Sequence, residues 1–332
     1  MNHIDALWLR RALELARRSI PSSVEPNPPV GAVIAIDSHL LGEGYHRAFG
    51  GPHAEIEALH SVKDALRLPD ATLYVTLEPC CHTEKKTPPC VPEIISSGIR
   101  RVVIGCKDPN PAVTGKGIRA LREAGIDVLL APQSAPFEKL IRHFKVNVQQ
   151  KRPYITLKWA QANLSDDLYD RGFIGSRTVK RWAISSFWGK VWGHKLRARH
   201  SHIAVGYGTW RLDTPALTTR YFPGANPKPL IFYEPERGIP PQADERFMPL
   251  EYPLHALLRR LYEEFRVGSI LVEGGASLLN RFIAAGLYDE VHVLVRLNQK
   301  SPPSSVLAPV LPNLRWKRFR LMPDEVVLSA YK

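Results

Sequence analysis

The chain has 332 residues, 44% hydrophobic and 23% charged, which excludes a disordered or fibrous protein. Its formal net charge of +13 suits anionic partners, yet the sequence contains no block of five like charges. No apolar run reaches the roughly 18 residues that a membrane span needs. We expect no membrane partner. The N-terminal segment lacks a signal-peptide cleavage region, so we expect a cytoplasmic protein.

The first half of the chain alternates predicted helices and strands. Leucine and alanine recur at helical spacing near the N-terminus, and a proline-rich stretch ends that helix. Short runs rich in strand formers follow, the first two expected to pair as a hairpin. The expected helices cover residues 5–18, 53–62, 91–97, 117–124 and 137–148, and the expected strands cover residues 30–36, 40–45, 72–77, 100–105 and 126–131. This alternation predicts an α/β fold with a sheet between helices.

The length of the chain predicts two domains. Prolines at 132–136 and the Lys-Arg-Pro at 151–153 indicate a break, so we place the boundary at about residue 150. This gives domains of residues 1–150 and 151–332. The second half again mixes helices with strands, which we expect at residues 154–160, 202–205, 230–233, 269–272 and 290–295.

A metal-ligating pattern stands out in the first half. Three of the four cysteines lie between positions 80 and 90, too few for a disulfide framework and typical of metal ligation. His53, Cys80 and Cys90 would supply one imidazole and two thiolates, a suitable ligand set for a catalytic Zn²⁺ that keeps one position open for water. Glu55 can take a proton from that water and pass it on. A Zn²⁺ with three protein ligands and a neighbouring carboxylate predicts hydrolytic deamination of a heterocyclic amidine.

Two alternatives for this pattern stay open. A closed structural site would use His53, Cys80, Cys81 and Cys90, although adjacent cysteines rarely both reach one metal and Glu55 would have no role. The positive charge favours a nucleic-acid-editing deaminase, but such enzymes commonly space the two cysteines by two residues, whereas nine residues separate Cys80 from Cys90. We therefore expect no nucleic-acid partner.

Longer motifs extend through both halves. They read PNPPVGAVI at 26–34, GPHAE at 51–55, TLEPCCH at 76–82, TPPC at 87–90, KDPNPAVTGKGI at 107–118, GYGTWRLDTPALTTR at 206–220 and VEGGASLLNRF at 272–282. With these motifs the chain resembles the bifunctional deaminase–reductase family of riboflavin biosynthesis. The resemblance implies an N-terminal cytidine-deaminase-like three-layer domain, a C-terminal dihydrofolate-reductase-like domain that binds NADPH, and a homo-oligomer, either dimer or tetramer.

The same resemblance implies two consecutive steps on a phosphorylated pyrimidine. The first is hydrolytic deamination of 2,5-diamino-6-ribosylamino-4(3H)-pyrimidinone 5′-phosphate, and the second is reduction of its ribosyl group to ribityl by NADPH. Glycines between a strand and a helix let backbone amides approach a phosphate, and paired guanidinium groups can clamp a ribose phosphate. The implied NADPH contacts are Ala160, Thr209, Asp213, Gly275, Ala276, Ser277, Leu278, Leu279, Asn280 and Arg281. The implied substrate contacts are Asn27, Arg197, Leu217, Arg220 and Glu273.

The chain departs from the family pattern around the expected cofactor cleft. Residues 162–170 lack the usual Asp-Gly turn, and residues 299–305 replace a Gly-Gly stretch. The family's tryptophan aligns with Ala183 unless Trp182 substitutes for it, and Glu234-Pro235 replaces an Asp-Ser pair. An active deaminase whose C-terminal domain is catalytically weak, or only a scaffold, therefore stays open. Next to the metal ligands, the loop at 83–86 is expected to border the pocket, and the role of His82 stays open.

Overall fold

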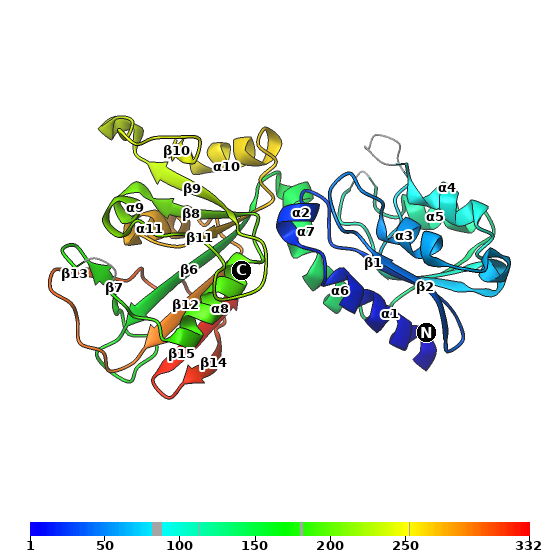
Figure 1. Ribbon diagram of the computed structural model, residues 1–332, viewed down its shortest axis with the longest axis horizontal. Coiled ribbons are helices and arrows are strands. Elements are labelled where there is room, and N and C mark those ends of the chain that lie inside the picture. The colour runs from blue at the N-terminus through cyan, green and yellow to red at the C-terminus, as the bar shows by residue number, and fades with distance from the viewer. Residues whose placement is uncertain (82–87, 112, 180–181, 252) are drawn as a thin grey trace. The chain divides into compact units, whose positions relative to one another are not determined.

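The computed structural model describes residues 1–81, 88–111, 113–179, 182–251 and 253–332. Its contacts divide the chain into two compact units, Met1–Lys151 and Arg152–Lys332, each built around its own sheet (Figure 1). Across these described ranges, no helix is both long and apolar enough to cross a membrane.

The first unit is a mixed sheet with helices on both faces. Its strands are β1 (Gly31–Ile36), β2 (His39–Tyr45), β3 (Thr72–Leu77), β4 (Arg101–Cys106) and β5 (Asp127–Leu130), in the order β2-β1-β3-β4-β5. Its helices are α1 (His3–Ala16), α2 (Pro21–Val24), α3 (Ala54–Ser61), η1 (Ala65–Asp70), α4 (Cys90–Ser96), α5 (Lys116–Glu123), α6 (Ala135–Leu140) and α7 (Arg142–Gln150). β1 and β2 form the predicted hairpin, whereas β3, β4 and β5 are parallel because crossover segments containing helices connect them.

Alternating side chains of the central strands build the two cores of this unit. In β4, Val102 and Ile104 pack on the face covered by α3, α4 and α5, and Val103 packs on the face covered by α1 and α6. All three are fully buried, as a strand between two helical layers requires. The predicted three-layer α/β fold is therefore confirmed for the first unit.

Helix α1 approaches β1 more closely than a side chain on the strand would allow. A Cβ at Gly31 would lie 2.1 Å from the carbonyl oxygen of Ala12, so only glycine fits there. The helix begins with a capping box in which the Asn2 side chain accepts from the backbone N–H of Asp5 and the Asp5 side chain accepts from the backbone of Asn2. Asp5 also pairs with Arg101 of β4, which ties the helix to the sheet.

The prediction of one helix over residues 137–148 is wrong. The structure has two helices, α6 and α7, separated at Ile141, whose backbone leaves helical geometry (φ −94°, ψ 16°). Ile141 is 2% exposed and belongs to the core beneath the sheet. The helical pattern of the neighbouring residues therefore does not continue through this buried position.

The second unit is a larger mixed sheet, ten-stranded within the described residues. Its strands are β6 (Tyr154–Ala162), β7 (Phe173–Ser176), β8 (His202–Gly206), β9 (Lys228–Tyr233), β10 (Phe247–Pro249), β11 (Ser269–Val272), β12 (Glu290–Arg296), β13 (Ser305–Leu307), β14 (Lys317–Met322) and β15 (Glu325–Tyr331). Its helices are α8 (Phe187–Arg197), α9 (Tyr207–Asp213), η2 (Pro235–Arg237), α10 (Leu254–Glu263) and α11 (Ala276–Ala284). The main order is β10-β9-β8-β11-β6-β12-β15-β14, parallel from β10 to β12.

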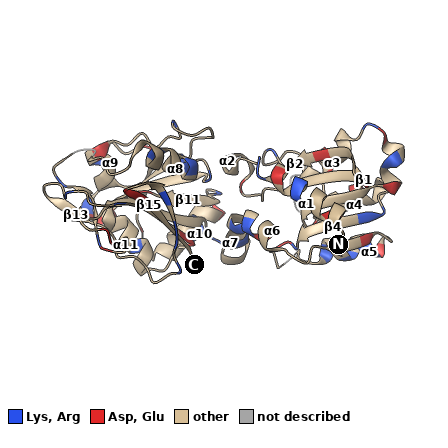
Figure 2. Cartoon of the chain, turned by 90° about the horizontal axis from the view of Figure 1, so that it is seen from below, with Lys and Arg blue, Asp and Glu red and all other residues tan. Residues whose placement is uncertain are grey.

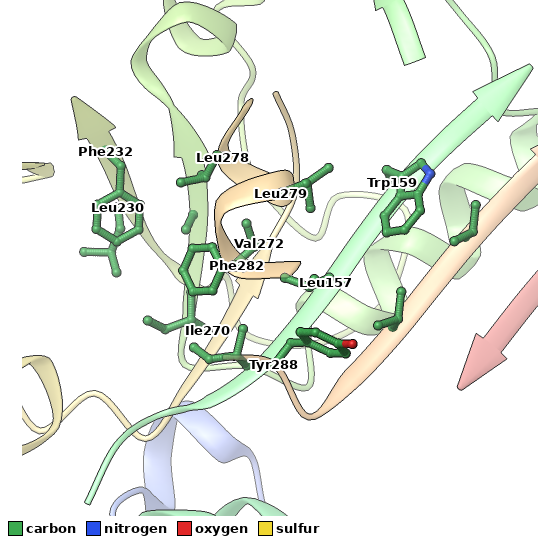
Figure 3. Close-up of a cluster of buried hydrophobic side chains, with 14 of the residues drawn as sticks. Leu157, Trp159, Leu230, Phe232, Ile270, Val272, Leu278, Leu279, Phe282 and Tyr288 are labelled. Atoms are coloured by element: carbon green, nitrogen blue, oxygen red, sulfur yellow. The ribbon is translucent and has the colours of Figure 1, made fainter. Parts of the chain in front are cut away.

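One large core lies between this sheet and its helices. Figure 3 shows Leu279 and Phe282 of α11 packed against Leu157 of β6 and Val272 of β11. All four side chains are fully buried. Truncating a side chain such as Phe282 to alanine costs about 3–5 kcal/mol of folding free energy. This packing holds α11, and with it the glycine turn at its N-terminus, against the sheet.

Five strands of the second unit were not predicted, namely β7, β10, β13, β14 and β15. β14 is an edge strand whose first four residues are all exposed, so it has no buried face to create an alternating pattern. β7, β10 and β13 have only three or four residues each. These four strands form because neighbouring strands offer hydrogen-bonding partners, which local sequence does not reveal. β15 is different, because its apolar residues Val326, Val327 and Leu328 are buried and form a strand signal that the sequence analysis missed.

Candidate active sites

Three metal-ligating side chains meet at one edge of the sheet in the first unit. His53 immediately precedes α3, Cys80 lies three residues after the end of β3, and Cys90 is the first residue of α4. The Nδ1 atom of His53 lies 3.2 Å from Sγ of Cys90 and 3.6 Å from Sγ of Cys80. All three ligand atoms lie within 4.8 Å of one another. The fold therefore brings together the three ligands predicted from the sequence.

This donor set fits zinc. One imidazole nitrogen and two thiols match the ligands of catalytic sites, which keep a fourth position for water. Among the residues that the structure describes, the clustered group contains neither a fourth ligand nor Cys81, which a closed structural site would require. A hydrogen bond with Cys80, together with burial, raises the pKa of the Cys90 thiol in the absence of a cation. A bound metal ion reverses that preference, because coordinated thiols are deprotonated.

Glu55 lies beside these ligands on the first turn of α3. Its side chain is buried, and burial raises the pKa of its carboxyl group, although His53 opposes the increase. The carboxyl group also forms a hydrogen bond with the Cys90 side chain. A buried carboxyl whose pKa is raised holds a proton more readily than an exposed one, so it can both accept and return a proton. Such a group is suited to proton transfer at the metal site.

The position of Asn27 depends on His46, which the sequence analysis did not single out. His46 is buried, and its Nδ1 lies 3.0 Å from the carbonyl oxygen of Pro52. Because that oxygen can only accept, Nδ1 carries the proton and Nε2 accepts from the Asn27 amide at 3.2 Å. The His46 ring also contacts the ring of His53 edge-on, with centroids 5.4 Å apart. Asn27 is thus linked to the metal-ligating His53 through the ring of His46.

Glu78 is a second residue that the sequence analysis missed. One of its carboxylate oxygens accepts from the backbone N–H groups of Asp108 and Gly115, and the other accepts from those of Gly117 and Ile118, at 3.0–3.2 Å. Glu78 is buried and lies two residues before Cys80. It therefore anchors the segment that contains the KDPNPAVTGKGI motif to the strand end that leads to Cys80. The clue in the sequence was an acidic residue at the end of an apolar strand.

Two expectations about the border of this site concern residues that the structure does not describe. The loop at 83–86 was expected to border the pocket, and His82 was considered as a residue that faces it; both lie outside the described residues.

The second unit contains a cavity of about 670 Å³ at the carboxyl ends of its parallel strands. Glu273 follows β11, Arg197 ends α8, and Leu217 and Arg220 come from the segment after α9. All four line this cavity, so the four substrate contacts predicted for this unit come together. The cavity also contains Trp182 and Ala183, the two positions considered for the family's tryptophan.

Glu273 is the centre of an ion-pair cluster in this cavity. Arg197 pairs with both of its carboxylate oxygens, at 2.6 and 3.1 Å, and donates to the carbonyl oxygen of Thr218 at 2.8 Å. Lys158 of β6, which the sequence analysis missed, lies 3.9 Å from the carboxylate. Burial alone would raise the pKa of Glu273, but Lys158 and Arg197 lower it to about 2. Burial also lowers the pKa of the Lys158 ammonium.

Arg220 differs from Arg197 in its surroundings. Its guanidinium group lies over the ring of Tyr221 and donates to Oγ1 of Thr218 at 3.3 Å. Among the described residues no carboxylate forms an ion pair with it, and the residue is exposed. The two arginines of the expected ribose-phosphate clamp therefore differ in their surroundings, because Glu273 engages Arg197 and not Arg220, and the clamp itself stays a prediction.

The glycine turn before α11 fits a phosphate group. Gly274 and Gly275 have φ angles of +130° and +68°, which residues with a side chain rarely adopt. A Cβ at Gly275 would lie 2.9 Å from Oγ1 of Thr209. Backbone amides at this helix start can therefore approach an anion closely, as the phosphates of a dinucleotide require.

The residues predicted to contact NADPH separate into two groups. Most of them line the cavity already described or a second cavity of about 590 Å³ next to it, namely Ala160, Thr209, Asp213, Gly275, Ala276, Ser277, Leu278 and Arg281. Leu279 is instead buried in the core, and Asn280 is exposed on α11; neither lines either cavity.

Basic residues are spread over both units in Figure 2 and do not gather into one block. The first cavity of the second unit is nevertheless rich in cationic side chains. Its charged lining residues are Lys158, Arg177, Lys190, Arg197, Asp213, Arg220 and Glu273. The positive charge therefore suits a small anionic ligand in this cavity. The scattered basic residues of the surface do not form a site for a long nucleic acid.

Two family models match the chain. The model described as "Cytidine and deoxycytidylate deaminase zinc-binding region" matches residues 2–106, and the model described as "RibD C-terminal domain" matches residues 170–296. The first range includes His53, Glu55 and Cys80, and the second includes the glycine turn.

Full-length relatives cover both units. The chain is 34% identical over 323 residues to "Riboflavin biosynthesis protein RibD" of Aquifex aeolicus, covering 89% of this chain and 87% of that protein. It is also 34% identical over 331 residues to the protein of the same name from Escherichia coli, covering 88% of this chain and 87% of that protein.

Solved structures extend the similarity to the fold. Acinetobacter baumannii RibD is similar with a TM-score of 0.83 and 29% identity over 98% of both chains. A diaminohydroxyphosphoribosylaminopyrimidine deaminase/5-amino-6-(5-phosphoribosylamino)uracil reductase from Thermotoga maritima is similar with a TM-score of 0.77 and 32% identity over 99% of both chains. The resemblance inferred from the motifs is therefore confirmed over nearly the whole chain.

Proposed function

The chain belongs to the bifunctional deaminase–reductase family of riboflavin biosynthesis, and we propose that it carries out both reactions on one phosphorylated pyrimidine. The substrate of the first step is 2,5-diamino-6-ribosylamino-4(3H)-pyrimidinone 5′-phosphate, which loses its ring amino group by hydrolysis. In the second step the ribosyl group is reduced to ribityl. The convergence of Glu55 with His53, Cys80 and Cys90 is the observation that carries this proposal.

In the deaminase reaction, His53, Cys80 and Cys90 would hold the zinc ion. The metal, when bound, supplies a water of lowered pKa. Glu55 takes a proton from the attacking water and delivers it to the ring nitrogen. It then transfers the second proton of that water to the amino group, which departs as ammonia. The buried environment of Glu55 supports this role, because its raised pKa eases the return of the proton. Asn27, whose amide is oriented by His46, binds a polar group of the pyrimidine.

In the reductase reaction, the two cavities of the second unit would hold NADPH and the deaminated substrate. NADPH, when bound, supplies the hydride for the first ribosyl carbon. The turn at Gly274 and Gly275 holds the cofactor phosphates, and Arg220 binds the ribose phosphate of the substrate. Arg197 orients Glu273 rather than sharing the phosphate, because its guanidinium is engaged by that carboxylate. Lys158, whose ammonium lies 3.9 Å from Glu273, can donate the one proton that accompanies the hydride.

A matched pair of variants tests the proposal. Glu55→Gln should keep zinc and lower ammonia release from the diaminopyrimidine substrate by several orders of magnitude, because an amide cannot carry the proton. Glu57→Gln on the same helix removes an equal charge and should leave the rate within about twofold. Both variants should still oxidise NADPH when given the deaminated substrate. A Glu55→Gln rate within tenfold of the wild-type rate would contradict the assigned role.

A scaffold without reductase activity is the second candidate for the Arg152–Lys332 unit. The observation that favours it is the exposed Ala183 at a cavity position where the family has tryptophan. The two candidates differ in one measurement. Purified protein supplied with the deaminated substrate oxidises NADPH if the unit is a reductase and leaves NADPH unchanged if it is a scaffold.

A further inference from the structure

One face of α8 lines the first cavity of the second unit. Lys190, His194 and Arg197 are spaced by four and three residues, which places them on the same side of the helix, and all three line the cavity. Lys190 is exposed, whereas His194 is buried. A buried histidine at the wall of a cavity that suits an anion can bind that anion if a ring N–H faces it.

The surroundings of His194 determine which of its ring nitrogens carries the proton. Nδ1 lies 3.1 Å from the backbone nitrogen of Tyr221, which can only donate, so Nδ1 is the acceptor. Burial lowers the pKa of His194 to about 4, and the charges of Arg197 and Arg220 act in the same direction. The ring is therefore neutral at neutral pH, and its single proton is on Nε2.

Nε2 has one neighbouring acceptor in the protein, the carbonyl group of Thr219. This carbonyl lies near the ring, but it already accepts from the backbone N–H of Phe222 at 2.8 Å. Nε2 is not among the buried polar atoms that lack a partner in the described part of the chain, so it is not sealed in the core. A phosphate oxygen is a stronger acceptor than a shared carbonyl, because its negative charge strengthens the hydrogen bond.

Tyr221 brings His194 and Arg220 to the same part of the cavity. The rings of Tyr221 and His194 are in contact, with centroids 4.8 Å apart, and the Arg220 guanidinium lies 5.0 Å from the centroid of the same Tyr221 ring. All three residues line the cavity. One cationic donor and one neutral donor therefore lie around a single aromatic ring.

We propose that His194 donates through Nε2 to the ribose phosphate that Arg220 binds. This inference rests on the proposed function of the second unit, and it adds a substrate contact that the sequence motifs did not indicate. A phosphate group has three terminal oxygens and can accept from several donors at once. A neutral donor adds a hydrogen bond to the anion without adding a third positive charge beside Arg197 and Arg220.

A role limited to holding the segment at Tyr221 predicts the opposite effects of two substitutions. The asparagine amide takes the place of Nδ1, whereas the amide of glutamine, one methylene longer, takes the place of Nε2. His194→Asn therefore keeps the acceptor for the Tyr221 N–H and loses the donor to the cavity, and His194→Gln does the reverse. If the donor binds the phosphate, only the asparagine variant loses affinity; if the bond to Tyr221 is what matters, only the glutamine variant does.

Calorimetric titration of the deaminated substrate into the full chain, in the absence of NADPH, measures binding without turnover. His194→Asn should weaken this binding about tenfold or more, the effect of losing a hydrogen bond to a charged group. His194→Gln should stay within about threefold of wild type. The dephosphorylated form of the ligand should bind wild type and both variants with affinities within about threefold, because it has no phosphate for Nε2 to contact.

His255→Asn is the matched control. His255 is exposed on α10 and lines neither cavity, so this variant should bind both forms of the ligand as wild type does. Circular dichroism checks that each variant is folded. If His194→Gln does not fold, the comparison of the two ligand forms in His194→Asn still decides.

Two results would overturn the inference and leave the proposed reductase standing. In the first, His194→Asn binds the phosphorylated ligand as tightly as wild type. In the second, it weakens binding of the phosphorylated and dephosphorylated ligands equally. Absence of binding of the deaminated substrate to the folded wild-type protein would instead overturn both the inference and the proposed reductase.

Discussion

Small differences in position decide what neighbouring side chains of the first unit can do. Cys80 and Cys81 are adjacent, yet only Cys80 lies with His53 and Cys90 in the metal-ligating group. Cys81 is partly exposed, and burial raises the pKa of its thiol. Cys81 instead packs, partly buried, against the neighbouring hydrophobic core.

Zinc content tests this assignment residue by residue. Wild-type protein and Cys81→Ser should each bind about one zinc ion per chain, whereas Cys80→Ser should lose most of it, because a hydroxyl is a poor ligand for zinc beside a thiolate. Elemental analysis after dialysis measures the content, and circular dichroism checks that each variant is folded. Loss of zinc from Cys81→Ser would instead favour the closed structural site.

The cavity of the second unit holds a histidine whose protonation opposes folding. His194 is buried and accepts from the backbone N–H of Tyr221 through Nδ1 at 3.1 Å. Burial lowers its pKa to about 4, and the nearby charges of Arg197 and Arg220 act in the same direction. In the unfolded chain the pKa returns to about 6.5. Between these values the unfolded state binds the extra proton, so the stability of the fold falls as the pH decreases.

Replacing His194 by Asn keeps a short acceptor for the Tyr221 N–H and removes the titration. Below pH 4 we expect the variant to recover about 1–3 kcal/mol relative to wild type, compared with their difference above pH 7. Denaturant titrations of both proteins between these pH values measure the change. Subtracting the two curves cancels the other buried histidines. A difference that is independent of pH would show that His194 is not held neutral by the fold.

At the scale of elements, one buried carboxylate orders the segment between β4 and α5. The backbone N–H groups of Asp108, Gly115, Gly117 and Ile118 all point to Glu78, at the end of β3. A Cβ at Gly117 would lie 2.1 Å from the carbonyl oxygen of Pro79, so this segment packs directly on the backbone that leads to Cys80. The KDPNPAVTGKGI motif therefore has a structural role, because it holds in place the segment between β3 and Cys80.

Glu78→Gln should destabilise the first unit by about 1.5–3 kcal/mol, the range for hydrogen bonds to charged groups. The amide keeps one oxygen but presents N–H groups to two backbone donors, which lose their partner. Glu93→Gln in α4 removes an exposed carboxylate and should have almost no effect. The midpoint of urea unfolding, followed for the zinc-loaded protein, measures both changes. Equal midpoints for the two variants would show that the anchor contributes little.

For the whole molecule, each unit has separate cores and would hold a different ligand. The Met1–Lys151 unit contains the metal ligands, and the Arg152–Lys332 unit contains both cavities described above. A ligand that binds only the folded form of one unit stabilises that unit in proportion to its concentration and affinity. Zinc and the dinucleotide should therefore act on different parts of the unfolding profile.

Differential scanning calorimetry tests this expectation. We expect two transitions, of which removal of zinc by a chelator lowers one by several degrees, because metal binding contributes directly to folding. NADP⁺ or NAD⁺ should raise only the other transition. Assignment of the transitions follows from Cys80→Ser, which should mimic the chelator. A single transition that responds to both ligands would contradict independent unfolding of the units.

Local features of the sequence were sufficient to predict most strands of the first unit and the residues of its metal site. Its sheet has strands with buried faces, so apolar runs marked β1, β3 and β4 to within a residue or two. Zinc chemistry admits few residue types, so His53, Cys80, Cys90 and Glu55 were recognisable before their distances were known. The single predicted helix over 137–148 is wrong because the backbone leaves helical geometry at the buried Ile141, which the pattern of apolar residues does not show.

Only the tertiary structure decided the partners of charged groups and the positions of strands without a buried face. The resemblance placed Arg197 and Arg220 together at the ribose phosphate, but of these two arginines Glu273 pairs with Arg197. It likewise placed Leu279 among the cofactor contacts, although the rotation of α11 buries that side chain in the core. β14 pairs at the sheet edge with no pattern of its own. Residue type and spacing determine which chemistry is available, whereas ion pairs, helix rotation and strand pairing depend on segments far apart in the chain.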